Sequence, residues 1–187
     1  MSKKGKLIIY SGPSGVGKGT VRKELFKLDD LKLTYSISMT TRSPREGEIE
    51  GIDYFFVTKD YFEQEIKNGA FLEYAVFVGN YYGTPKKYVD ELLDKGFNVM
   101  LEIEIEGAKQ VMEKCPEAIS IFLMPPSFDA LEARIRGRRT EEEEIVQMRL
   151  NKARHELNLY DKYQYVVVND SVEKAKEEIA NIIRKVA

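Results

Sequence analysis

The segment Gly12-Pro-Ser-Gly-Val-Gly-Lys-Gly-Thr20 decides the fold class of this 187-residue chain. Apolar residues 7–10 precede it and a stretch with helical periodicity, 17–28, overlaps its end, so a strand leads into the glycines and a helix leads out. In that setting, glycines let the backbone turn several N–H groups toward one anion, while the lysine adds a charge and the helix adds its dipole. The segment predicts a phosphate-binding loop, and a glycine-rich turn with an exposed lysine is the alternative.

The loop departs from the usual pattern at one position. Gly19 follows Lys18 where such loops normally carry a serine or threonine whose hydroxyl binds magnesium, and Thr20 comes one residue later. Because magnesium keeps several of its waters, we expect nucleotide oxygens and water to hold it, with acidic residues further out. The protein ligands of the metal are therefore left unassigned.

Short apolar runs outside the loop predict a parallel sheet. The runs at 6–10, 99–103, 120–124 and 165–168 are nearly continuous, as in strands buried on both faces. Helical stretches lie between them, and the last helix begins at Val172 after Asp170-Ser171. Alternation of strands and helices predicts an α/β core in which helices cover both faces of the sheet.

The alternation is interrupted between residues 35 and 84. Aromatic-rich runs at 54–57, 72–77 and 81–84 predict short antiparallel strands, with one helix after Thr58. The next helix is expected to take Thr84 as its N-cap, with proline in its first turn, and to close at Gly96.

A second interruption follows residues 125–126, which are both proline. Ser127 is expected to cap a helix that ends near Gly137, and Thr140 with Glu143 predicts a capping box for the helix after it. We therefore expect one domain over 1–187, with a core formed by 5–34, 96–126 and 160–187, an insertion at 35–90 and a helical insertion at 127–158.

Composition excludes several classes of protein. The net charge of −2 argues against a general nucleic-acid binder, and the 43% hydrophobic content argues against disorder. The apolar run at 7–10 is too short for a signal peptide, and no run reaches membrane-spanning length. With Cys115 as the only cysteine there is no internal disulfide, so we expect a cytoplasmic protein without a membrane or nucleic-acid partner.

Beyond the loop, an ordered set of short motifs resembles the guanylate kinase family. After Gly12–Thr20 the set continues with TTRSPREG at 40–47, DY at 53–54, FLEY at 71–74, GNYYGT at 79–84 and GRRT at 137–140, covering essentially the whole chain. The resemblance implies a P-loop kinase core, a mixed α+β GMP-binding lobe at 35–90 and a helical lid at 127–158. It also implies transfer of the γ-phosphoryl group of ATP, accompanied by Mg²⁺, to GMP and dGMP by a monomer or small homo-oligomer.

The resemblance assigns roles to individual residues. It places ATP on Gly12, Pro13, Ser14, Gly15, Val16, Gly17, Lys18, Gly19 and Thr20. It places GMP on Ser38, Arg42, Arg45, Tyr54, Glu73, Tyr82, Thr84 and Glu102. The catalytic residues it implies are Lys18, Arg42, Arg134, Arg138 and Arg149.

Elementary chemistry supports part of this assignment. Arg42 and Arg45 flank a Ser-Pro turn where two planar guanidinium groups could grip one phosphate, although a solvated loop is an equal alternative from the residues alone. Glu73 lies in an apolar run, where an inward carboxylate is costly unless it is paired. The adjacent N1–H and N2 donors of guanine would pair with it, whereas adenine has an acceptor at N1. An outward strand position is the alternative for Glu73.

Two points stay open at this stage. The family usually carries aspartates and then glutamine where this sequence has Glu102, Glu104 and Glu106, so which of them contacts the acceptor or a metal-bound water is undecided. The rival functions are a scaffold module that binds phosphorylated peptides, which would generally lack a complete phosphate loop, and a kinase for another small acceptor.

Overall fold

The structure is a computed structural model that describes residues 3–137 and 142–186. Its central sheet has the order β2-β7-β1-β8-β9, and every neighbouring pair is parallel. The strands are β1 (Leu7–Ser11), β2 (Leu33–Tyr35), β7 (Asn98–Glu102), β8 (Ile119–Met124) and β9 (Tyr165–Val168). The predicted parallel α/β core is confirmed, with β2 as a strand that the sequence analysis did not foresee.

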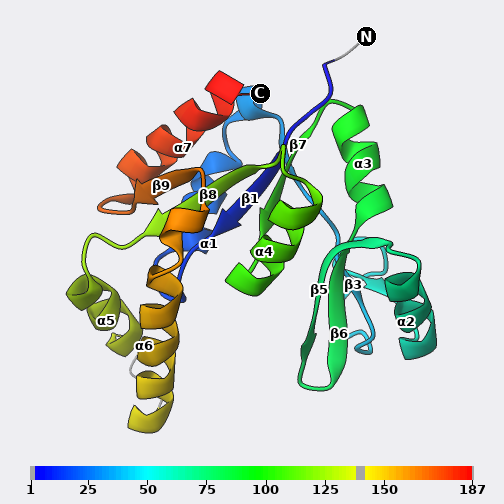
Figure 1. The fold of residues 1–187 in the computed structure, drawn as a ribbon, viewed down its shortest axis with the longest axis horizontal. Coiled ribbons are helices and arrows are strands. Elements are labelled where there is room, and N and C mark those ends of the chain that lie inside the picture. The colour runs from blue at the N-terminus through cyan, green and yellow to red at the C-terminus, as the bar shows by residue number, and fades with distance from the viewer. Residues whose placement is uncertain (1–2, 138–141, 187) are drawn as a thin grey trace.

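Helices cover both faces of this sheet (Figure 1). Alternate residues of β1 point to opposite faces, with Ile8 and Tyr10 in one buried cluster and Leu7 and Ile9 in the other. The first cluster is completed mainly by α1 (Lys18–Leu25), α7 (Val172–Val186), α5 (Phe128–Arg136) and α6 (Glu143–Leu157). The second is completed mainly by α3 (Lys86–Asp94) and α4 (Ile105–Lys114).

A second sheet is built from the middle of the chain. Its order is β4-β3-β6-β5, formed by β3 (Met39–Thr40), β4 (Phe55–Phe56), β5 (Phe71–Phe77) and β6 (Asn80–Pro85). The helix α2 (Lys59–Lys67) packs on it through Phe62, whose ring stacks on Phe71 at 4.3 Å and on Tyr81 at 5.0 Å. The sheet is mixed and not wholly antiparallel as predicted, because the long connection from β3 returns β4 in the parallel direction.

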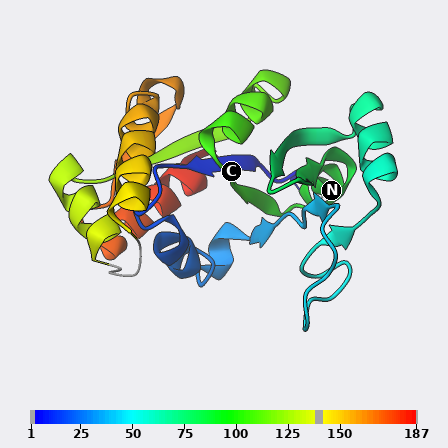
Figure 2. The ribbon, with the colours of Figure 1, turned by 90° about the horizontal axis from the view of Figure 1, so that it is seen from below.

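The segments that flank the core lie far apart. Seen from below, α5 and α6 occupy one end of the molecule and the second sheet with α2 the other, with β1 between them (Figure 2). The Ser127 hydroxyl accepts the backbone N–H of Ala130 at 3.1 Å, as a helix N-cap does. Two short 3₁₀ turns, Asp29–Leu31 and Tyr160–Lys162, complete the described elements.

Three local predictions are wrong. Strand β9 is not buried on both faces, since it forms the sheet edge and leaves Val166 37% and Val168 44% exposed. Thr84 does not cap a helix, because β6 continues to Pro85 and α3 begins one residue later. Glu143 is the first residue of α6, with Glu142 at the N-cap, so it does not occupy the third position of a capping box. Thr140 lies outside the described residues.

Within the described residues, no helix combines the length and the apolar composition that a membrane span would need.

Candidate active site

The glycine-rich segment forms the turn between β1 and α1. Gly15 and Gly17 have φ angles of 85° and 98°, in the left-handed region that glycine adopts without strain. A Cβ atom at Gly17 would lie 2.8 Å from Asn169 Nδ2, so the close approach of Asn169 also requires a glycine there. Gly17 is the N-cap of α1, which leaves the first N–H groups of that helix directed into the turn.

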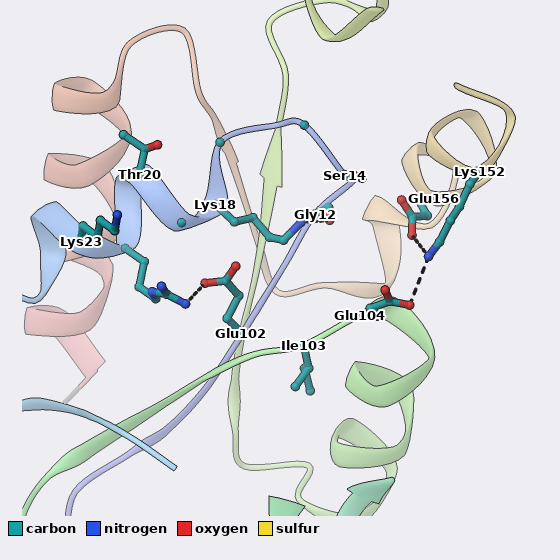
Figure 3. A pocket seen from close by; sticks show the side chains of 14 residues that line it. Gly12, Ser14, Lys18, Thr20, Lys23, Glu102, Ile103, Glu104, Lys152 and Glu156 are labelled. Atoms are coloured by element: carbon teal, nitrogen blue, oxygen red, sulfur yellow. Dashed lines mark hydrogen bonds and ion pairs between the residues drawn. The ribbon is translucent and has the colours of Figure 1, made fainter. Parts of the chain in front are cut away.

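Lys18 lies over this turn. Its ammonium donates to the carbonyl oxygens of Gly12 at 2.6 Å and Pro13 at 3.1 Å, and burial lowers the pKa of the group. The side chain borders a cavity of about 580 Å³ into which basic and acidic residues project (Figure 3). Besides the loop, the charged lining residues are Arg22, Lys23, Glu102, Glu104, Lys152 and Glu156.

Arg22 is a cavity residue that the sequence analysis missed. Its guanidinium forms an ion pair with Glu102 at the end of β7 and lies over the ring of Tyr35, 5.2 Å from the centroid. The available signal was the spacing, because a residue four positions after Lys18 lies on the same face of α1. Glu102 therefore meets a cation of the protein itself, and its contact with the acceptor or a metal-bound water stays a prediction.

Lys152 of α6 was also missed. Its ammonium lies between two carboxylates, 3.2 Å from Glu104 Oε2 and 3.8 Å from Glu156 Oε1 (Figure 3). Glu156 is 8% exposed and burial raises the pKa of its carboxyl group. This trio, which lines the cavity, joins α6 to the beginning of α4.

The predicted lid arginines approach the loop from different sides. Arg149 donates to the Ser14 hydroxyl at 3.1 Å, whereas Arg134 donates to the carbonyl oxygens of Val16 at 3.1 Å and Asn169 at 3.3 Å. Arg134 lines a second hollow of about 480 Å³, which it shares with Thr20, Asp170 and Ser171 among others. The structure does not bring Arg134 into the cavity beside Lys18, and Arg138 lies outside the described residues.

The second sheet holds the residues predicted to bind the acceptor phosphate. Arg42 forms a bidentate pair with Glu48, at 3.0 and 2.8 Å, and Glu48 also accepts the backbone N–H of Arg45 at 2.7 Å. These contacts, led by the hydrogen bond from Arg42, lower the pKa of Glu48 to about 2. The Arg42 guanidinium lies 5.5 Å from the Tyr54 ring centroid, and that ring meets Tyr82 edge to face. Glu48 carried no recognisable signal in the sequence.

Glu73 points into the protein from β5. The side chain is largely buried, the residue being 9% exposed, and its Oε1 accepts the Thr84 hydroxyl at 2.5 Å from the neighbouring strand β6. Burial raises the pKa of this carboxyl group, which is only partly opposed by the Thr84 hydrogen bond and the charge of Lys114. Ser38 precedes β3, and its carbonyl accepts the N–H of Phe55 at 2.9 Å.

Within the described residues, no cluster of three or more histidine, cysteine or acidic side chains could hold a metal ion. The acidic groups near Lys18 are instead spread along the cavity, and Glu102 and Glu104 are 24% and 80% exposed in their side chains.

Comparison with known proteins agrees with this geometry. A family model described as Guanylate kinase matches residues 4–186. Proteins named guanylate kinase from two strains of Streptococcus thermophilus are each 54% identical over 183 residues, which is 98% of this chain and 88% of theirs. The crystal structure of guanylate kinase from Anaplasma phagocytophilum superimposes with a TM-score of 0.71 at 35% identity, covering 98% of this chain and 87% of that one.

Proposed function

The chain belongs to the guanylate kinase family, whose members phosphorylate GMP with ATP. On that premise we propose which of its residues bind the donor, which bind the acceptor and which stabilise the transferring group. The enzyme transfers the γ-phosphoryl group of ATP to GMP, giving ADP and GDP. We extend the acceptors to dGMP. The division into a GMP-binding insertion at 35–90 and a lid at 127–158 is part of the proposal, as are a cytoplasmic location and a monomer or small homo-oligomer.

The donor nucleotide binds at the turn between β1 and α1. Backbone N–H groups of the glycine-rich loop, to which Pro13 contributes none, and the dipole of α1 would face the phosphates. Lys18 would exchange the carbonyl oxygens of Gly12 and Pro13 for phosphate oxygens. Phosphoryl transfer depends on alignment and charge neutralisation, and a GMP phosphate is already largely ionised at neutral pH because its second pKa is about 6. The reaction therefore requires no general base.

Magnesium fits this cavity as an ion held by nucleotide oxygens and water. Glu102 and Thr20 are among the residues that line the cavity with Lys18, and their oxygens suit hydrogen bonds to water better than a closed set of protein ligands. Bound there with ATP, the ion would neutralise phosphate charge. Glu102 and Thr20 would orient its waters.

The basic side chains of α5 and α6 complete the donor site. Arg149 already contacts Ser14 in the loop, and Arg134 fixes the carbonyls of Val16 and Asn169. We propose that Arg149 and Arg138 neutralise charge on the transferring phosphoryl group when the lid closes. Arg134 would instead position the glycine-rich loop through its hydrogen bonds to the carbonyl oxygens of Val16 and Asn169. Closure of such a segment excludes water and so favours GMP over hydrolysis.

The acceptor binds between the second sheet and the core. The observation that carries the assignment is the buried carboxylate of Glu73, whose two oxygens suit the adjacent N1–H and N2 donors of guanine. Thr84 of β6 orients the Glu73 carboxylate, and Ser38 directly precedes β3, the strand next to β6. Glu48 holds the Arg42 guanidinium in a fixed direction. Arg42, Arg45, Tyr54 and Tyr82 would then bind the GMP phosphate.

Substitution of Glu73 by glutamine tests the assignment. Glu73→Gln keeps one acceptor but turns an NH₂ donor toward one of the two guanine donors, which costs about 1–3 kcal/mol. We expect kcat/KM for GMP to fall about ten- to a hundredfold while the melting temperature of the empty enzyme holds or rises. Glu113→Gln, at an exposed position of α4, is the matched control. A loss of activity no larger than the loss of folded protein would make Glu73 a structural residue.

A further inference from the structure

Helix α4 contacts strand β5 on both sides of Glu73. The contacts come from Gly107, Gln110 and Lys114, which are spaced three and four residues apart and so lie on one face of the helix. β5 is the edge of the second sheet and α4 belongs to the core, so these residues connect the acceptor lobe to the main sheet.

Gln110 pairs with the backbone of Tyr74, the residue after Glu73. Its Oε1 accepts the Tyr74 N–H at 3.2 Å, and its Nε2 donates to the Tyr74 carbonyl at 3.1 Å. These are the two groups that a further strand would satisfy at a sheet edge. One side-chain amide therefore replaces a strand and fixes the peptide plane that follows Glu73.

Lys114 acts on the other side, at an irregularity in the strand. The pairing of β5 with β6 shifts register between Phe71 and Glu73, and Lys114 Nζ donates to the Phe71 carbonyl at that point, at 2.8 Å. Such bulges turn the side chains that follow them. Here Leu72 enters the core cluster beneath α3 and α4 while Glu73 meets Thr84.

Gly107 leaves space for the carboxylate itself. A Cβ atom at this position would lie 3.0 Å from Glu73 Oε2 and 3.5 Å from Cδ. The other oxygen, Oε1, already accepts the Thr84 hydroxyl at 2.5 Å. The carboxylate thus lies between a hydrogen-bond donor and a helix backbone, and a methyl group at position 107 would fit only if the carboxylate shifted by a few tenths of an ångström.

We propose that this face of α4 positions Glu73 for recognition of the guanine base. Gln110 and Lys114 hold the backbone of β5 on either side of Glu73. Gly107 limits how closely the Glu73 carboxylate can approach α4. These are positioning residues, since they act through Glu73 and not on the substrate. The inference rests on the role proposed above for Glu73.

The test uses the ratio of kcat/KM for GMP to kcat/KM for IMP, whose hypoxanthine base keeps N1–H but lacks the 2-amino group. An unfolded fraction lowers both values equally, so the ratio reports the geometry at Glu73 and not stability. Gln110→Leu removes both bonds to Tyr74, and we expect the ratio to fall about tenfold with KM for ATP unchanged, because small misplacements of a binding group are costly. Glu113→Leu is the control, because it introduces the same leucine at an exposed position of α4, and it should keep the wild-type ratio.

Gly107→Ala distinguishes an effect on positioning from an effect on stability, because we expect the melting temperature and the GMP/IMP ratio not to fall together. Alanine is the better helix former, so the melting temperature should hold or rise, while the added methyl group displaces Glu73 and lowers the GMP/IMP ratio. A wild-type ratio in both Gln110→Leu and Gly107→Ala would overturn the inference.

A double substitution identifies the route. In a Glu73→Gln background, Gln110→Leu should not change the ratio further, because the group through which it acts has been altered. An undiminished effect in that background would contradict positioning through Glu73. If Glu73→Gln alone leaves the ratio at its wild-type value, the proposed function of Glu73 fails and the inference fails with it. If Glu73→Gln lowers the ratio and the α4 variants do not, only the inference fails.

Discussion

At the scale of single residues, Lys18 is held in a setting that suits the phosphate-binding role proposed for it. Its ammonium rests on the carbonyl oxygens of Gly12 and Pro13, and burial lowers its pKa. Two neutral acceptors compensate its charge only in part, so in the proposed role the group would gain most from contact with phosphate oxygens. The residue type and its place after the glycines were evident from the sequence, whereas the carbonyl partners depend on the curl of the loop.

Lys18→Met should nearly abolish transfer without removing acceptor binding. The methionine keeps the volume of the stem but lacks the charge that meets the donor phosphates, so we expect kcat to fall by about 10²–10³-fold or more. Calorimetry should find the affinity for GMP within a few fold of wild type.

Lys109→Met, at an exposed position of α4, serves as the control and should retain full turnover. Wild-type turnover in Lys18→Met would exclude the loop from the reaction.

At the scale of elements, the turn of the hairpin β5–β6 contains a valine in a backbone conformation that valine disfavours. Val78 and Gly79 connect the strands with φ angles of 47° and 74°. Two positive angles in succession define a two-residue turn that asparagine followed by glycine favours. A β-branched residue in this conformation is strained, and Val78 is also 80% exposed, so no packing compensates.

Val78→Asn should therefore stabilise the protein. Relief of the left-handed strain is worth about 1 kcal/mol, which corresponds to about 2–4 °C in a chain of this size. Thermal unfolding followed by circular dichroism would measure the shift, with kinase activity unchanged. Val76→Asn, on an exposed position within the strand itself, should give no gain. A lower melting temperature in Val78→Asn would show that strain at this turn does not limit stability.

The errors at the scale of elements have physical causes. The run 165–168 reads as a buried strand, but β9 lies at the edge of the sheet and has α7 on one face only. Thr84 precedes a proline and a helix, which is the pattern of an N-cap, yet its hydroxyl is used by Glu73 across the sheet. The position of β9 in the sheet decided the first case, and a contact with a neighbouring strand overrode a local preference in the second.

At the scale of the molecule, the second sheet is attached to the core at a position where a carboxyl group is buried at a cost in stability. Leu72 enters the core cluster formed with α3 and α4, and next to it Glu73 is held in a poorly solvated position. Burial raises the pKa of Glu73 above its ordinary value of 4.5, so the folded state binds this proton more tightly than the unfolded chain.

The sign of the resulting pH dependence follows from linkage. Stability from this group is fully present below the unfolded pKa of 4.5 and is lost as pH rises through the raised folded pKa. Glu73→Gln lacks this pH-dependent loss of stability. The melting temperature of the variant minus that of the wild type should therefore increase between about pH 4 and about pH 8. Differential scanning calorimetry across that range, with Glu113→Gln as control, measures the difference. A difference that does not change with pH would mean that Glu73 titrates as an exposed carboxyl group.

The sequence by itself determined the α/β class, the phosphate-binding loop and the family, because these depend on local patterns: apolar periodicity, glycine spacing and ordered short motifs. It also singled out Glu73, since a carboxylate in an apolar run demands a partner. Only the tertiary structure decided that Arg22 faces Glu102, that Glu48 holds Arg42 and that Gln110 secures the strand beside Glu73. The first and third of these contacts join residues 80 and 36 positions apart, and all three involve polar side chains that also occur on solvated surfaces. Their partners depend on how helices and strands are brought together in space, which composition and periodicity do not encode.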